Sequence, residues 1–309
     1  MYPTFGNGSS RRLTAYMNTR NQNARCLPPP HFTEMSELPP ELEREIFLKF
    51  CADSPPGDCI QLLLVAWRVK QWIEPLLYRT IVLSSVRPPE GRPLFTTSTF
   101  LVALRTRPSF FREAVRNLMI HSVPDEAIHT ILATCTRLEN LWAPMASDIL
   151  FDLITSSHVH HDPPPLNQLY TNFMPLLQAL PHTHPFFSRL THLEVIGCPT
   201  RRQEALWVAR LGQLPCLTHL AFNEYALVPA LSSLFQSCGL LQVLVSLVGS
   251  PADVEERDES QDSRFVVLFS RWYEDWQLGV ERGQDYWSKA ESIVAMRLKD
   301  KAEEIQIPE

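Results

Sequence analysis

Glycine is scarce in this chain of 309 residues, which holds 10 glycines against 26 prolines. That balance predicts rigid helix starts and stiff connections rather than glycine-hinged loops. Cysteine occurs seven times, an odd count without a C-x-x-C pair, and most of the cysteines lie in apolar segments. Both features favour reduced thiols over a disulfide framework. We therefore expect an intracellular protein of the cytoplasm or the nucleus.

The sequence also lacks the common signatures of catalysis and of nucleotide binding. It contains no G-x-S-x-G, no cysteine-protease signature, no G-x-x-x-x-G-K-[ST] and no G-x-G-x-x-G. Its net charge is −6, whereas a nucleic-acid binder needs a basic face that neutralises phosphates. No apolar run approaches the roughly 18 residues of a membrane span, and no apolar signal segment follows the start. We expect a non-enzyme without cofactor, bound metal, nucleic-acid partner or membrane partner.

Residues 1–33 form a basic N-terminal arm with four arginines and no acidic residue. Such a composition occurs in transit peptides for organelles, and it also occurs in disordered polar arms. Asparagine, glycine and proline interrupt any amphipathic helix in this stretch. We therefore interpret residues 1–33 as a disordered arm.

Residues 34–84 show the pattern of three short amphipathic helices. Two prolines, Pro39 and Pro40, suit the first turn of a helix, where a missing N–H is harmless. A second apolar segment runs from Ile60 to Val69, and a third from Gln71 to Tyr78. The first helix carries an apolar residue every four positions, which predicts a stripe on one face: Leu38, Leu42, Ile46 and Phe50.

The segments LPPELEREIF (38–47) and LLLVAWRVKQWIEPLLYRTI (62–81) resemble an F-box, in the divergent form common in fungal proteins. The resemblance implies docking onto a Skp-type adaptor, and through it onto a cullin, in a cullin–RING (SCF-type) ubiquitin ligase. Many F-boxes carry a cysteine or serine stretch where this chain has LLVAW at 63–67. The implied adaptor-facing residues are Leu38, Pro39, Leu42, Ile46, Val65 and Val69.

A second interpretation of the same helices stays open. A three-helix module of about fifty residues can form only a marginal hydrophobic core, so it gains stability from a partner or from the next domain. The helices then only cap the following domain, and the protein is a ligase-independent interaction scaffold. Residues 85–114 would supply a proline-rich linker and a first helix.

Residues 115–272 repeat one motif, a short predicted strand with leucines spaced as L-x-x-L. The period of 23 to 28 residues lies in the range of leucine-rich repeats. The pattern predicts an irregular α/β solenoid of short parallel strands with outer helices at 125–137, 146–156, 201–211 and 228–238. The central leucines are Leu118, Leu141, Leu169, Leu193, Leu220, Leu244 and Leu268.

The strand positions opposite the leucines should form a broad surface for a protein target. Their charge shows no clear bias, and the target cannot be identified from them. The neighbours on these strands include His121, His192, Glu194, His219 and Glu224.

Residues 273–309 predict a C-terminal helical cap over the last repeat. They resemble the terminal segment of the same fungal F-box group at Asp275-Trp276 and Tyr286-Trp287. The aromatic residues here suit either cap packing, which we favour, or a binding hot spot. Helical spacing places on one face Trp287, Ala290, Val294 and Leu298.

Two polar insertions are candidate ion sites. His158, His160, His161 and Asp162 are followed by prolines, and the adjacent histidines are poorly placed to share one zinc ion. A polar loop is favoured over a metal-dependent enzyme that uses His158–Asp162. The acidic loop at 250–263, inside the array, lacks the alternating ligands and glycine of an EF-hand, so we expect a solvated loop.

Overall fold

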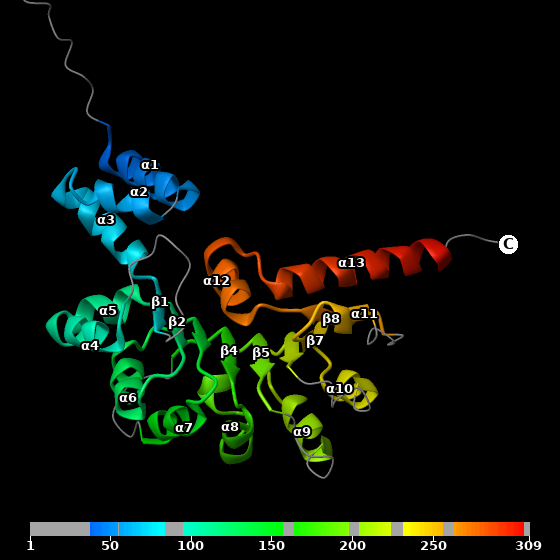
Figure 1. The fold of residues 1–309 in the computed structure, drawn as a ribbon. Helices are drawn as coiled ribbons and strands as arrows, with labels where there is room; N and C mark the ends of the chain where they lie inside the picture. Colours follow the sequence, from blue (N-terminus) through cyan, green and yellow to red (C-terminus); the bar gives the residue numbers. More distant parts are fainter. Residues whose placement is uncertain are drawn as a thin grey trace, which may run out of the picture.

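The structure, a computed structural model, describes residues 38–54, 56–83, 95–156, 164–197, 204–223, 231–255 and 262–305. Within that part, eight strands form one parallel open sheet in sequential order, and helices cover both of its faces (Figure 1). Each strand-to-strand connection therefore crosses over beside the sheet, as parallel pairing requires. This α/β solenoid-like arrangement confirms the parallel strands and outer helices predicted from the repeat.

The predicted leucines lie in one register across most of the sheet. Leu118 pairs with Leu141, and the row continues through Leu169 and Leu193 to Leu220 and Leu244. All six are buried against the outer helices. The strands are β1 Thr80–Leu83, β2 Asn117–Ile120, β3 Asn140–Trp142, β4 Gln168–Thr171, β5 His192–Val195, β6 His219–Phe222, β7 Val243–Val248 and β8 Phe265–Phe269.

Two strands differ from the sequence prediction. Ile81 pairs with Leu118, so β1 lies inside the range 34–84 that was assigned to the helical module. At the other end, Leu268 pairs with Leu247, while Phe265 takes the place beside Leu244. A shift by an odd number of residues turns a side chain to the opposite face. Leu268 accordingly packs on the inner face rather than in the leucine row.

The outer helices cover the leucine row and close the main core. The fully buried Trp207 packs against Phe222 at 4.9 Å between ring centroids, which joins α9 to β6. The predicted starts of two of these helices, at 201 and 228, lie outside the described residues. The outer elements are α4 Thr97–Thr106, α5 Pro108–Ala114, α6 Asp125–Thr134, α7 Ser147–Ser156, α8 Met174–Ala179, the 3-10 turn Pro185–Phe187, α9 Glu204–Leu211, α10 Leu231–Ser237 and α11 Ala252–Glu255.

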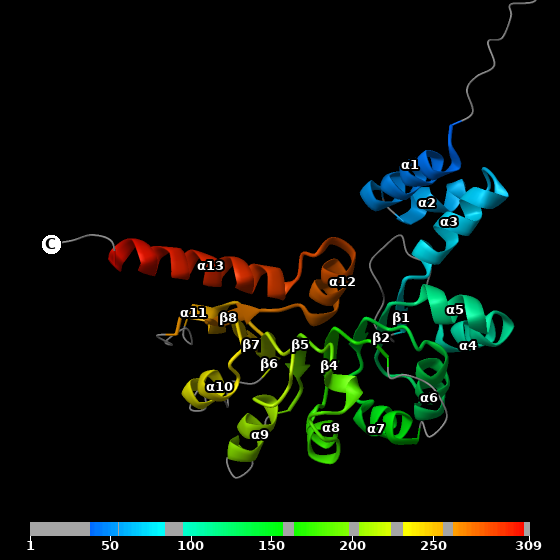
Figure 2. The ribbon, with the colours of Figure 1, turned by 180° about the vertical axis from the view of Figure 1, so that it is seen from behind.

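The C-terminal helices α12 (Trp272–Arg282) and α13 (Tyr286–Ile305) lie on the sheet face opposite the outer helices (Figures 1 and 2). The predicted C-terminal cap lies on this inner face, where α13 packs against the last two strands, β7 and β8. The inner face of the later strands is apolar and would otherwise meet water: Ala221, Val245, Leu247 and Val266. Three residues of the predicted stripe pack there, whereas Leu298 remains 50 % exposed.

The N-terminal helices are α1 (Pro40–Asp53), α2 (Pro56–Leu62) and α3 (Trp67–Leu77). The apolar segment 60–69 was predicted as one helix, but residues 63–65 form a turn with i→i−3 backbone hydrogen bonds. Ala66 is extended, with φ −158° and ψ 154°, which separates α2 from α3. Among the described residues, no helix combines the length and the apolar composition that crossing a membrane would require.

Candidate functional site

The helices α1 to α3 form a small body with a core of its own. Cys59, Val69 and Ile73 are buried at its centre, and Phe47 and Leu48 of α1 pack on them from one side. Arg68 donates two hydrogen bonds to the Glu43 carboxylate, at 2.7 and 2.9 Å, and this ion pair ties α3 to α1. The core of the module therefore lies against one side of α1 only.

The opposite side of α1 is an apolar stripe that no described part of the chain covers. It follows the predicted spacing of four residues, and none of the residues of α1 is buried. Exposed single apolar residues are common, but a contiguous row of them marks a contact surface. The stripe consists of Leu38 (47 % exposed), Leu42 (48 %), Ile46 (58 %) and Phe50 (46 %).

The turn between α2 and α3 adds a second group of exposed apolar side chains. Leu64 is 88 % exposed, Val65 60 % and Trp67 70 %. Val69, by contrast, is fully buried in the module core, so the prediction that its side chain faces an adaptor is wrong. Val69 lies near the start of α3 and packs with Ile73 and Cys59 in the module core. The other residues of that set, Pro39 included, are exposed.

The module is attached to the sheet through the end of α3. Tyr78 makes edge contacts with Phe110 and Phe111, at 5.5 and 5.3 Å between ring centroids. Beside it, the Arg107 guanidinium donates to both oxygens of Glu74, at 2.6 and 3.1 Å. These hydrogen bonds hold the pKa of Glu74 below its ordinary value. Attachment thus uses α3 and leaves the stripe on α1 free.

The inner sheet face carries two rows of side chains, set by the strand register. The row of middle positions is largely apolar and is covered by α12 and α13. The row at the strand starts is polar and runs through Thr80, Asn117, Asn140, Gln168, His192 and His219. The broad surface predicted on this face is therefore partly occupied by the chain's own C-terminal helices.

Among the described residues of strands β1 to β8, Glu194 is the only buried acidic residue. Tyr286 of α13 donates a 2.5 Å hydrogen bond from its hydroxyl to Glu194 Oε2. Burial raises the pKa of Glu194 to about 8, because water is excluded from the carboxyl group. Glu194 is thereby largely protonated at neutral pH, which lets an acid lie in an apolar layer without a cation beside it.

Two histidines occupy equivalent positions on neighbouring strands. His192 of β5 and His219 of β6 are register partners, and their rings stack at 4.1 Å and 10°. Burial lowers the pKa of both, that of His192 to about 3, so the pair is neutral at neutral pH. Glu291 of α13 approaches His219, with Oε1 3.1 Å from Nε2. Sequence reasoning missed this cluster, although the repeated LTHL at 190–193 and 217–220 signals it.

An open cleft of about 780 Å³ lies at the entry ends of the strands, beneath α5. Its charged lining consists of four arginines and two glutamates: Arg112, Arg116, Arg137, Arg189, Glu113 and Glu139. Ion pairs engage part of them, since Arg137 approaches Glu113 at 3.2 Å and Arg116 approaches Glu139 at 3.8 Å. The excess of positive charge suits an acidic segment of a partner.

Several residues weighed from the sequence lie outside the described residues. They are the arm 1–33, positions 85–94 of the linker, the loop with His158–Asp162, Glu224, and positions 256–261 of the acidic loop. Among the described cysteines, Cys59, Cys135 and Cys238 are buried, and all five are free thiols. Burial raises the pKa of Cys135 to about 12, which opposes formation of a thiolate.

No protein-family model matches this chain, and no curated protein matches it in sequence.

Proposed function

We propose that this protein is a non-catalytic substrate receptor of a cullin–RING ubiquitin ligase, docking through α1 to α3. The observation that carries the proposal is the uncovered apolar stripe of α1. The helices contribute Leu38, Leu42 and Ile46 from the stripe, and Val65 from the following turn, to contact a Skp-type adaptor. The F-box-like sequence of residues 38–47 and 62–81 supports this choice of partner.

The competing function is a scaffold in which the helices only cap the sheet. The contacts of Tyr78 and Glu74 with the first array helices do supply such a cap. A cap, however, has no use for apolar side chains on the far side of α1, where burial in a partner gains about 25 cal/mol for each Å². The stripe therefore favours docking over capping alone.

We also propose that the array is leucine-rich-repeat-like and holds the target. Support comes from the aligned leucine row and from the arginine-rich cleft at the strand entry ends. The adaptor links the receptor to a cullin, and the ligase transfers ubiquitin, so the chain needs no catalytic group of its own. Such ligases act in the cytoplasm and the nucleus, where we propose the protein resides. We propose neither nucleic-acid nor membrane partners for it.

The test is co-purification of the full chain with a Skp-type adaptor and a cullin. Leu42→Asp combined with Ile46→Asp should abolish capture, because two carboxylates would be buried against an apolar partner. Both positions are exposed in the free chain, so folding should be unaffected. The matched control, Val102→Asp with Met296→Asp, changes two apolar residues elsewhere that are at least as exposed, and it should leave capture intact. Equal capture by the folded stripe variant would refute the proposed interface.

A further inference from the structure

We propose that His192, His219 and Glu291 form a binding site for one divalent transition-metal ion of the Zn²⁺ type, which joins α13 to the inner sheet face. The possible ligand atoms of the three residues all lie within 4.8 Å of one another. Two ligands come from neighbouring strands and the third from a helix that packs across them. The site is independent of the proposed adaptor docking, which uses the other end of the chain.

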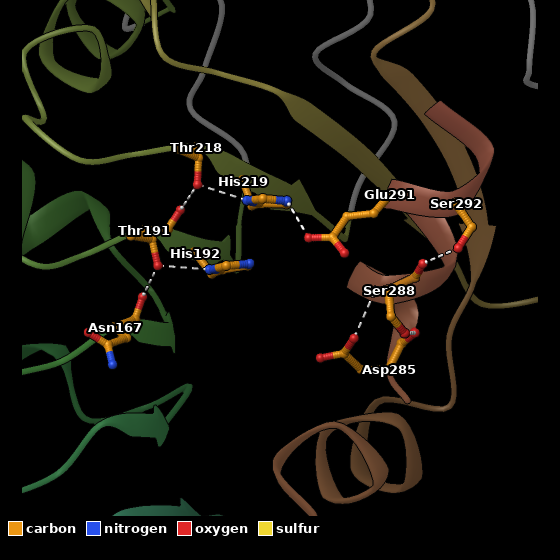
Figure 3. Close-up of polar contacts among 9 residues, drawn as sticks. All are labelled: Asn167, Thr191, His192, Thr218, His219, Asp285, Ser288, Glu291 and Ser292. Carbon is orange, nitrogen blue, oxygen red and sulfur yellow. Dashed lines mark hydrogen bonds and ion pairs between the residues drawn. The ribbon is translucent and has the colours of Figure 1, made fainter. Parts of the chain in front are cut away.

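Threonine hydroxyls contact Nδ1 of both histidines, which leaves Nε2 of each ring as the possible metal ligand (Figure 3). The Thr191 hydroxyl donates its single proton to the carbonyl oxygen of Asn167 at 3.1 Å. In the tautomer with hydrogen on Nδ1, the His192 ring donates to this hydroxyl across the 2.9 Å contact. His192 Nε2 is thereby left with a free lone pair.

The same arrangement is repeated one strand further along. The Thr218 hydroxyl donates to the carbonyl oxygen of Thr191 at 3.3 Å and contacts His219 Nδ1 at 2.8 Å. In the same tautomer, His219 Nε2 also presents a lone pair. Metal-binding histidines have this form, with one nitrogen free and the other donating to an anchored oxygen, which fixes the tautomer and the ring orientation.

The third ligand explains an otherwise unfavourable contact. Glu291 Oε1 lies 3.1 Å from His219 Nε2, yet that buried nitrogen has no hydrogen-bond partner. In the tautomer with hydrogen on Nδ1, the carboxylate oxygen and the imidazole lone pair are both acceptors, so the contact needs a proton or a metal cation between them. A metal cation held there uses both lone pairs.

The distances between the ligand atoms determine how far the three side chains must move to bind one ion. Zinc–nitrogen and zinc–oxygen bonds are about 2.0 to 2.2 Å, so ligand atoms on one ion are closer together than the 4.8 Å limit here. The stacked rings must tilt, because their lone pairs run nearly parallel. A cavity of about 20 Å³ beside His192 gives that ring room, and the side chain of Glu291 is half exposed and adjustable. Two imidazoles and a carboxylate suit Zn²⁺ and leave one position for water.

The experiment is a titration with Co²⁺, followed by visible absorption, and with Zn²⁺, followed by calorimetry. It uses the full chain with His158, His160 and His161 replaced by asparagine, because the loop histidines would add a second binding signal. This parent should bind one ion. Glu291→Gln, which changes an exposed side chain, should weaken binding at least tenfold, and His219→Asn should abolish it. Glu303→Gln, on the exposed surface of the same helix, should have no effect.

Two results would overturn the proposal. One is a folded parent that binds neither ion. The other is binding that Glu291→Gln leaves unchanged, which would show adventitious metal at another place. Because Glu291→Gln removes no buried group, the conclusion does not depend on whether His219→Asn folds.

Discussion

Tyr286 and Glu194 lie 92 positions apart in the sequence, and the phenol of the first donates a 2.5 Å hydrogen bond to the buried carboxyl group of the second. This bond joins α13 to β5 in the middle of the inner face. Together with the packing of α13 on β7 and β8, it holds the helix against the inner sheet face. Both residues are buried, so water cannot replace the bond if it is lost.

Replacing Tyr286 by phenylalanine should therefore destabilise the protein by about 1–3 kcal/mol, the typical cost of leaving a buried polar group without its partner. Urea unfolding of the two proteins measures the difference. Tyr273→Phe is the control, because Tyr273 lies on the same face but is only partly buried, and it should cost less. Equal stabilities of Tyr286→Phe and the parent would show that this bond contributes nothing.

The pairing of Glu74 with Arg107 predicts a dependence of stability on pH. The pKa of Glu74 is lowered in the folded state, mainly by hydrogen bonds from Arg107. A depressed acid contributes stability above its unfolded pKa, and this contribution is lost as the pH falls through the folded pKa. Glu74→Gln should thus be less stable than wild type at neutral pH, by at most about 1 kcal/mol for a partly exposed pair.

The difference between wild type and Glu74→Gln should disappear at acidic pH, where both side chains are neutral. Urea midpoints across the acidic range measure it. Glu303→Gln is the control, since the side chain of Glu303 is exposed and its ion pair with Lys299 is long, at 3.7 Å. A gap between wild type and Glu74→Gln that persists below the folded pKa would contradict the assignment of the ion pair.

Gly283 ends α12 in the left-handed conformation, with φ +64°. A side chain is strained there, so Gly283→Ala should destabilise the protein by about 1 kcal/mol and loosen the junction between α12 and α13. Thermal unfolding measures this cost. Gly239→Ala is the matched control, since that residue has open space around it and no positive φ. Equal effects of the two substitutions would show that the turn does not depend on glycine.

The sequence predicted the parts of the fold that follow local periodicity. The leucine row from Leu118 to Leu244 was predicted from a repeat of 23 to 28 residues, and the stripe on α1 from a spacing of four residues. The predicted register of Leu268 was wrong, because the segment FVVLF has apolar residues on both faces of the strand and only its pairing with β7 decides which of them join the leucine row. Periodicity within one segment cannot supply that choice.

The inner face depends on contacts between distant segments, which the sequence pattern did not reveal. The helical spacing of Trp287, Ala290 and Val294 predicted an apolar face on α13 but not the surface that it covers. The pairing of His192 with His219 was readable from the repeated LTHL, whereas the approach of Glu291 required the position of α13. The buried position of Val69 likewise depends on how α3 folds onto α2.

The central claim is that α1 to α3 bind a Skp-type adaptor, and titration calorimetry with the purified adaptor tests it most directly. The account predicts saturable one-to-one binding by the full chain, with a negative heat-capacity change because apolar surface is buried. Binding should be lost when Leu42 and Ile46 are both changed to aspartate. A folded wild-type chain that gives no binding heat at any temperature would contradict the account, and the helices would then serve only to cap the sheet.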